Sequence, residues 1–165
     1  MSTTTVTAVV MNSENQALSE YSGYDFNSFA ELEGAYLGAT QDGIFELTGD
    51  QDEYTSPTGN SPIPWKVRTG LSDFGTSLRK VMPYVYVGGK VGGDTYCHVL
   101  ASERGDKTES WYDCATTRAS PDTVRYSLGK GIRSKYLGVE LSSPEGAAFY
   151  LDTLELMVLP TSRRW

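Results

Sequence analysis

Short apolar segments broken by turn residues are the feature that most limits what this chain can fold into. Residues 35–40 and 44–47 flank Gln41-Asp42-Gly43, and Asp-Gly between two apolar runs is a strong signal for a β-hairpin. The 17 glycines supply further turns, and the 11 tyrosines suit half-buried pleated surfaces. Helical patterning is confined to residues 13–20, with Ser13 as a candidate cap. The sequence therefore predicts a mostly β protein.

Charge divides the chain into two unlike parts. Residues 1–65 contain ten acidic residues and no Lys or Arg, whereas residues 66–165 contain all 14 basic residues and 11 acidic ones. The change coincides with a Gly- and Pro-rich break at residues 49–64, where proline removes the amides that a strand ladder needs. We therefore expect an acidic N-terminal β-meander arm over residues 1–60 and a second domain over residues 61–165.

The second domain has the pattern of a β-sandwich. Strand-like segments with turns between them occupy residues 65–70, 81–91, 95–102, 109–116, 123–128, 136–141 and 149–159. Strands at this spacing predict an antiparallel β-sandwich, jelly-roll-like in form. The alternating apolar positions predict a core of Val67, Leu71, Val85, Val87, Val99, Leu137, Val139, Leu141, Leu151, Leu154 and Leu156.

Motifs for catalysis or cofactor binding are missing from the sequence. It has no Gly-x-Ser-x-Gly, HExxH or P-loop pattern, and His98 is the one histidine available as a general base. Gly129-Lys130-Gly131 is either a phosphate cradle or, more often for such a pattern, a tight turn. Arg104-Gly105-Asp106 spells an adhesion tripeptide that a charged hairpin tip also explains. We expect no enzymatic activity, no catalytic residues and no cofactor.

The two cysteines, Cys97 and Cys114, are expected to be small core residues. A chain made in a reducing cytoplasm usually keeps its thiols reduced, although the two could face each other across a hairpin. Zinc needs three or four such ligands, and adjacent Cys97 and His98 would point to opposite faces of a strand. We expect no metal site, and the sequence leaves open whether the cysteines are bridged.

Several longer blocks resemble tailed-bacteriophage virion structural proteins. The blocks lie between residues 9 and 164, at residues 17–21, 26–30, 36–39, 42–47, 67–75, 78–84, 128–136, 140–141, 146–152 and 160–164. The resemblance implies a component of the tail or its tip, present in many copies or as a symmetric ring. One block departs from the pattern, because Val81-Met82-Pro83 keeps the family's proline but has an apolar pair before it. No binding residues carry over from the family.

The expected function is therefore that of a structural tail protein, in the tail tip, baseplate or a tail ring. The alternatives are a receptor- or carbohydrate-binding tail module and, less favoured, a capsid decoration protein. Its partners would be copies of itself and other tail proteins, with a host surface glycan or receptor as an additional candidate. We expect no nucleic acid partner and no membrane insertion, since no apolar run approaches the roughly 20 residues of a membrane span. The expected location is the virion tail, after assembly in the host cytoplasm.

The charge division suggests how such subunits would meet. An acidic segment is either a solvated face or a surface that docks on a basic one, belonging to its own chain or to a neighbour. We expect it to pack on an adjacent subunit, with apolar anchors at Tyr21, Phe26, Phe29 and Tyr36. The opposing basic residues would come from Lys66, Arg68, Arg79, Lys80, Lys130, Arg133, Lys135, Arg163 and Arg164.

Overall fold

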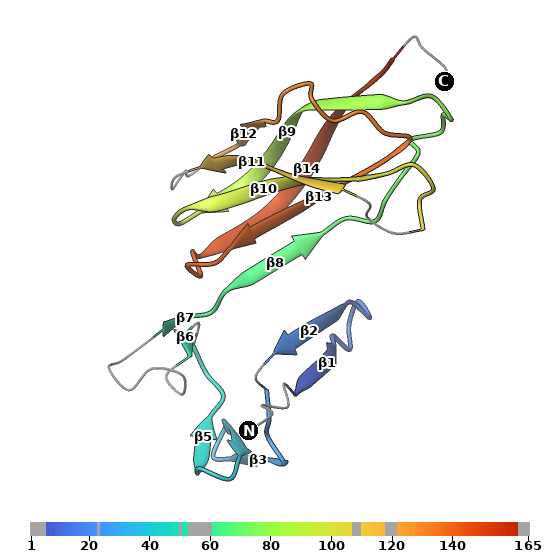
Figure 1. Cartoon of the computed structure of the whole chain (residues 1–165). Coiled ribbons are helices and arrows are strands. Elements are labelled where there is room, and N and C mark those ends of the chain that lie inside the picture. The colour runs from blue at the N-terminus through green and yellow to red at the C-terminus, as the bar shows by residue number, and fades with distance from the viewer. Residues whose placement is uncertain are drawn as a thin grey trace, which may run out of the picture. The chain divides into compact units, whose positions relative to one another are not determined.

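The computed structural model describes residues 6–22, 24–49, 51–52, 61–106, 110–117 and 122–161 (Figure 1). These residues form fourteen β-strands and no helix, and the strand pairs are antiparallel. The prediction of a mostly β protein is confirmed. The chain divides into two compact units, Met1–Asp50 (unit 1) and Gln51–Trp165 (unit 2). This division falls inside the Gly- and Pro-rich break at residues 49–64.

Unit 1 consists of two small antiparallel sheets. One is a hairpin of β1 (Thr7–Met11) and β2 (Leu18–Ser22); the other is a meander of β3 (Ser28–Leu32), β4 (Ala35–Ala39) and β5 (Ile44–Glu46). The Asp-Gly hairpin is confirmed, because the Thr40 amide donates to the Gly43 carbonyl at 2.9 Å and closes the turn between β4 and β5.

The helix expected at residues 13–20 is wrong. Its first half is the turn of the β1–β2 hairpin, and its second half belongs to β2. The Asn12 side-chain oxygen accepts from the amides of Glu14 at 2.8 Å and Asn15 at 3.4 Å, and Gln16 has a left-handed φ of 58°. Side-chain bonds of this kind give the backbone an alternative to helical hydrogen bonds. The polar residues that resembled a helix start therefore form a turn.

Unit 2 contains two larger sheets and one short strand pair. The four-stranded sheet has the order β11 (Ser110–Thr117), β10 (Thr95–Ser102), β13 (Tyr136–Ser143), β8 (Trp65–Arg68). The three-stranded sheet has the order β12 (Val124–Ser127), β9 (Lys80–Val91), β14 (Phe149–Pro160). The short pair is β6 (Gln51–Asp52) and β7 (Ser61–Pro62). The seven strands expected in this part of the chain are all present, with ends that differ by a few residues.

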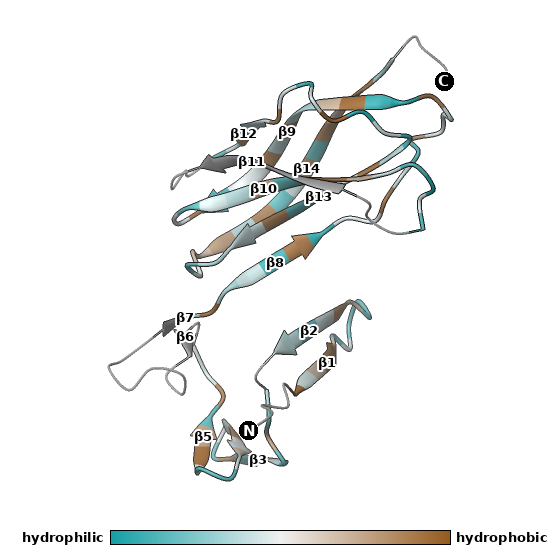
Figure 2. Cartoon of the chain, in the orientation of Figure 1, coloured by the Kyte–Doolittle hydropathy of each residue, from teal (hydrophilic) through white to brown (hydrophobic). Residues whose placement is uncertain are grey.

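The core of unit 2 draws side chains from both larger sheets. Val85 and Val87 of β9 lie in one hydrophobic cluster with Val99 of β10 and Val139 of β13. Figure 2 shows hydrophobic and hydrophilic residues alternating along β8 and β14, as expected for strands with one covered face. The core prediction is confirmed by burial for Val85, Val87, Val99, Leu137, Val139 and Leu141, and by half-buried packing on the cluster for Leu151, Leu154 and Leu156.

Two predicted core residues lie elsewhere. Val67 is 42% exposed, because β8 is the edge strand of its sheet and leaves that side chain without a covering neighbour. Leu71 follows β8 in a loop and is half-buried outside the core cluster. Periodicity assigns a face to a residue but does not show whether the strand lies in the middle of the sheet or at its edge.

The edges of the two sheets carry distinct local features. Trp65, at the start of β8, stacks on Phe149 at 4.3 Å between ring centroids, and its indole nitrogen donates to the Ala147 carbonyl at 2.7 Å. This contact ties the beginning of β8 to the beginning of β14. The edge strand β14 changes register against β9 twice, between Leu151 and Thr153 and again between Met157 and Leu159.

Candidate functional site

Unit 1 holds a cluster of five aromatic side chains, Tyr21, Tyr24, Phe26, Phe29 and Phe45 (the aromatic cluster). The ring centroids of Tyr24 lie 5.7 Å from Tyr21, 4.8 Å from Phe26 and 5.9 Å from Phe29. The Phe26 ring lies 5.8 Å from Phe29 and 6.4 Å from Phe45. These separations are within the range of favourable aromatic contacts. The aromatic cluster therefore joins β2 to the meander through the segment between them.

The register of the meander explains how these rings meet. Phe29 of β3 and Phe45 of β5 both pair with Gly38 of β4, which places their side chains on one face. Gly38 leaves room there for Phe26, because a Cβ at this position would lie 2.4 Å from the Phe26 Cδ1 atom. Tyr36 is two residues from Gly38 and shares the face. Glycine in the central strand is thus required by the ring above it.

Three of the four apolar anchors predicted from the sequence, Tyr21, Phe26 and Phe29, meet in the aromatic cluster. The fourth, Tyr36, is on the same face of the meander and is 61% exposed. The prediction did not include Tyr24 and Phe45. The signal for Tyr24 is the close aromatic spacing between residues 21 and 29, whereas the position of Phe45 depends on strand register.

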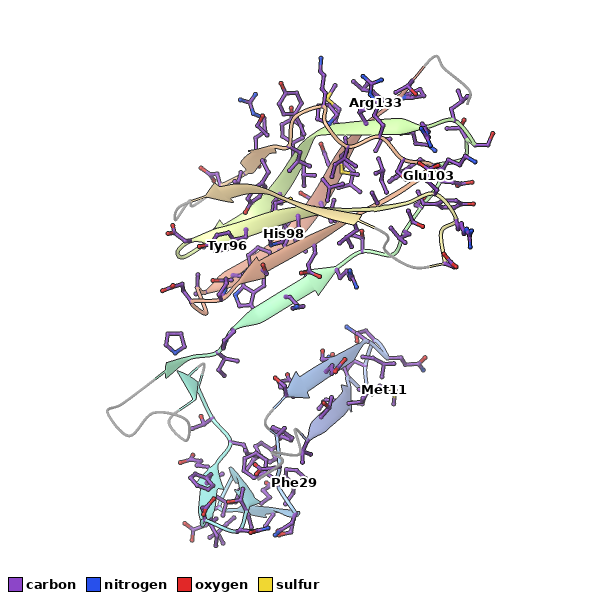
Figure 3. All side chains as sticks on the ribbon, in the orientation of Figure 1. Met11, Phe29, Tyr96, His98, Glu103 and Arg133 are labelled. Atoms are coloured by element: carbon purple, nitrogen blue, oxygen red, sulfur yellow. The ribbon has the colours of Figure 1, made fainter. Side chains whose placement is uncertain are left out.

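Unit 1 exposes most of its apolar surface. Among its described residues only Gly38 is buried, and every residue of β2 and β3 is exposed. Figure 3 labels two of the exposed side chains, Met11 and Phe29, each 60% exposed. The exposed large hydrophobic residues of this unit are Val6, Val9, Val10, Met11, Leu18, Tyr21, Phe29, Leu32, Tyr36 and Ile44. Surfaces of this kind typically mark sites of protein–protein contact.

The basic residues predicted to oppose the acidic segment are partly used within unit 2. Lys66 Nζ and Arg68 Nε, both on β8, lie 3.9 Å and 3.5 Å from the carboxylate of Glu140, whose side chain is almost completely buried. Arg79 Nε lies 3.1 Å from Glu103 Oε1. Lys66 and Arg68 remain half-exposed or more, so each ion pair leaves part of the cation at the surface. The predicted residues Arg163 and Arg164 lie outside the described residues.

The prediction that Lys80 belongs to the basic interface is wrong. Its side chain is 0% exposed, and Nζ donates to the carbonyl oxygens of Thr76 at 2.6 Å, Leu78 at 2.7 Å and Lys135 at 2.7 Å. Burial lowers the pKa of the Lys80 ammonium, and the nearby carboxylate of Asp73 opposes this shift. All three ammonium protons have backbone acceptors within the protein, so Lys80 fastens loops together and does not present charge to a partner.

The motifs singled out in the sequence lie in ordinary structural positions. His98 is half-buried on β10, with Nε2 3.3 Å from Ser142 Oγ. Gly129-Lys130-Gly131 is an exposed loop after β12, and Gly129 has a left-handed φ of 75°. Arg104-Gly105-Asp106 follows β10, where Ser102 Oγ accepts from the amides of residues 104 and 105. Gly129-Lys130-Gly131 thus lies in an exposed loop, and the tripeptide occupies the loop after β10.

The cysteine prediction is only partly covered by the described residues. Cys97 is buried in the core of unit 2, as expected for a small core residue. The side chain of Cys114, and with it the question of a bridge, lies outside the described residues. Among the side chains that are described, no group of three or more His, Cys, Asp or Glu is arranged to hold a metal ion. Within the same part of the chain no helix has the length and hydropathy to span a membrane.

Known proteins give no independent guide to the role of these surfaces. Comparisons of the chain with protein-family models, with curated proteins and with solved structures returned no significant match.

Proposed function

We propose that this chain is a non-enzymatic structural protein of a phage tail, in the tail tip, baseplate or a tail ring, that assembles through subunit interfaces. The observation that carries the proposal is the apolar exposure of unit 1, where Phe29 and Tyr36 on one face of the meander are 60% and 61% exposed and Ile44 on the other face is 74% exposed. An area of this kind is covered when subunits meet. The sequence blocks that resemble tail proteins support a phage tail as the particle to which such a subunit would belong.

The proposal extends to the form of unit 2, as an antiparallel β-sandwich of the jelly-roll type. Supporting it, Val85 and Val87 of the three-stranded sheet and Val99 and Val139 of the four-stranded sheet share one core. Two sheets packed face to face resist deformation because each strand is held by ladder hydrogen bonds and by core contacts. Such a body suits a part that transmits force and performs no chemistry.

Replacing three apolar residues of unit 1 tests the assembly role. In phage that encode the Phe29→Ser/Tyr36→Ser/Ile44→Ser variant, we expect at least about a tenfold loss of this protein from purified tails, since aromatic anchors dominate interface affinity. The matched control is Tyr150→Ser, which removes a 64% exposed aromatic ring from unit 2. Immunoblotting of purified particles measures both. Normal incorporation of the triple variant would exclude an assembly role for this surface.

A second candidate function is binding of a host glycan by the tail. It is favoured by Tyr84 and Tyr86, which are half-buried on the outward face of β9 with ring centroids 6.4 Å apart. The guanidinium of Arg125 lies 5.2 Å from the Tyr84 ring centroid. Aromatic faces with adjacent polar groups can stack on sugar rings. Binding of the wild type to a glycan array, lost in Tyr84→Ala/Tyr86→Ala, would establish this function alongside assembly.

A further inference from the structure

Three loops and their flanking residues meet at one end of unit 2 and make a basic surface (the basic end). The loops span residues 69–79, 103–106 and 128–135, and the surface consists of Arg79, Arg104, Lys130, Arg133 and Lys135. Figure 3 labels Arg133 and, near it, Glu103 at this end of the sheets. The acidic residues described in the same loops are Asp73, Glu103 and Asp106. Glu103 is already paired with Arg79, and no ion pair within the described part of the chain involves Lys130, Arg133 or Lys135.

The basic end is held together by backbone and buried polar contacts. Lys80 and Ser134 exchange backbone hydrogen bonds of 2.8 Å and 3.1 Å, and Ser134 Oγ donates to the Ser102 carbonyl at 2.5 Å. The buried Lys80 ammonium bonds to carbonyls of two of the loops. Because these contacts fix the loops to one another, the basic side chains project from a rigid base. A preorganised surface loses less entropy when it binds.

An exposed aromatic residue accompanies the positive charge. Phe74 is 39% exposed and has a left-handed φ of 48°, a backbone conformation that bulky residues rarely adopt. Its amide donates to Ser72 Oγ at 3.1 Å, and the next amide, of Gly75, donates to Asp73 Oδ1 at 3.0 Å. This tight turn presents an apolar side chain beside the basic residues. The basic end thus combines positive charge with an exposed apolar side chain. Unit 1 combines exposed apolar side chains with negative charge.

Unit 1 has the complementary surface. Residues 1–50 contain eight acidic residues and no Lys or Arg. In the meander, Glu31 pairs directly with Tyr36 and shares one face with it and with Phe29, whereas Glu46 pairs with Leu37 on the opposite face. A partner that covers the face of Phe29, Glu31 and Tyr36 must therefore meet a carboxylate and aromatic rings together.

The chain enters the sheets of unit 2 at the end opposite the basic end. Trp65 starts β8 beside Phe149 and Ala147, and the same end holds the Gly92–Ala148 backbone hydrogen bond of 2.7 Å. Within unit 2, the strand that follows the linker therefore begins at the end opposite the basic loops.

We propose that the basic end of one copy binds the acidic, apolar face of unit 1 of the next copy. This inference rests on the proposed function, because it names the partner that covers unit 1. The contact is heterologous, so each copy uses its basic end once and its unit 1 once. Repetition gives a closed ring where the rotation between neighbours closes and a filament where it does not. Charge sets the orientation of the two surfaces, and the aromatic rings supply most of the affinity.

Sedimentation of the full-length chain over a range of concentrations and salt tests the proposal. We expect wild-type protein to self-associate, and Lys130→Glu/Arg133→Glu to raise the Kd at least about tenfold at low salt. Lys90→Glu is the matched control, because Lys90 is exposed on β9 near the other end and should leave association unchanged. Circular dichroism confirms that each variant is folded. Wild-type protein that stays monomeric throughout would overturn the proposal.

A charge exchange gives the decisive result. Glu31→Lys in unit 1 should also weaken association, and the chain that carries all three substitutions should recover it, because the signs of both surfaces are then reversed together. A mixture of the two defective variants should also recover association, as alternating chains, since the reversed end of one variant matches the reversed unit 1 of the other and the two unchanged surfaces still match. Lack of recovery in the three-substitution chain would reject this pairing. If Lys130→Glu/Arg133→Glu still self-associates but is lost from tails, the basic end binds another tail protein: the head-to-tail pairing is then wrong while the tail function stands.

Discussion

Units 1 and 2 are built from the same kind of short antiparallel strand, yet they bury their side chains to very different degrees. Among its described residues, unit 2 has fifteen buried hydrophobic ones, which include Val85 and Leu137 at 0% exposure. Unit 1 has one buried residue among those described, a glycine. Turns and strand-forming residues are therefore sufficient for local strand pairing. Burial of side chains additionally requires apolar residues from other strands, as in the core that the two larger sheets of unit 2 share.

The consequence for unit 1 is low intrinsic stability. An isolated two-stranded hairpin is marginal in water, and three strands become stable when one face is covered. The aromatic cluster covers part of the meander, and Val9, Leu18 and Ile44 remain about 70% exposed. A partner that covers these residues would stabilise unit 1 by binding it, which links assembly to folding.

The difference in burial predicts that a Leu→Ala substitution has a large effect on stability in unit 2 and a small one in unit 1. Leu137→Ala removes a fully buried side chain from the core of unit 2 and should lower the free energy of unfolding by about 3–4 kcal/mol. Leu32→Ala removes a 62% exposed side chain from unit 1 and should change it by less than about 0.5 kcal/mol. Urea unfolding of the full-length chain measures both values. Similar losses in the two variants would mean that the units do not differ in burial as described.

The sequence was informative wherever a local pattern determines structure. The strands of unit 2 and the turn at residues 41–43 follow from alternation and from Asp-Gly, which act within a few residues. The type and close spacing of Tyr21, Phe26 and Phe29 likewise marked them as a group, and their rings meet in the aromatic cluster. Which of the exposed surfaces meets a partner does not follow from such local patterns.

Long-range contacts explain what the sequence did not predict. Lys80 resembles any other surface lysine in the sequence, and its role depends on the carbonyl of Lys135. Lys66 and Arg68 were expected to face a neighbour, but Glu140, some seventy residues away, lies beside them. The wrong helix prediction at residues 13–20 has a local cause instead, because the side-chain hydrogen bond of Asn12 stabilises a turn where the sequence pattern indicates a helix.

Lys80 gives a second test of the contrast between buried and exposed positions, with a smaller expected effect on the free energy of unfolding. Lys80→Met keeps most of the side-chain volume but leaves three carbonyl oxygens without their donor, so unfolding should become about 2–3 kcal/mol easier. Lys90→Met at an exposed position of the same strand should have almost no effect. Thermal unfolding in parallel buffers compares the two. Equal melting temperatures would show that the Lys80 ammonium is not needed to hold the loops.

The smallest expected effect concerns one hydroxyl group. Tyr126 and Thr95 share a hydrogen bond of 2.5 Å in the interior of unit 2, and burial raises the pKa of the Tyr126 phenol. Tyr126→Phe leaves the Thr95 hydroxyl unpaired and should cost about 1–2 kcal/mol. Tyr36→Phe, the same change on the exposed face of unit 1, should be neutral within about 0.5 kcal/mol. A neutral Tyr126→Phe in chemical denaturation would indicate that the Thr95 hydroxyl finds another partner.

The two register shifts of β14 bear on how this protein avoids the wrong assembly. A long, regular edge strand offers its free amides and carbonyls to any other strand, which is a common route to aggregation. The first shift leaves Asp152 of β14 unpaired, and the second sets two residues of β9 against one of β14; such irregularities increase the local twist, so the twelve residues of β14 do not form one straight template. The exposed carboxylates of Asp152 and Glu155 repel a second copy of the same edge. Indiscriminate sheet growth along this edge is thereby discouraged.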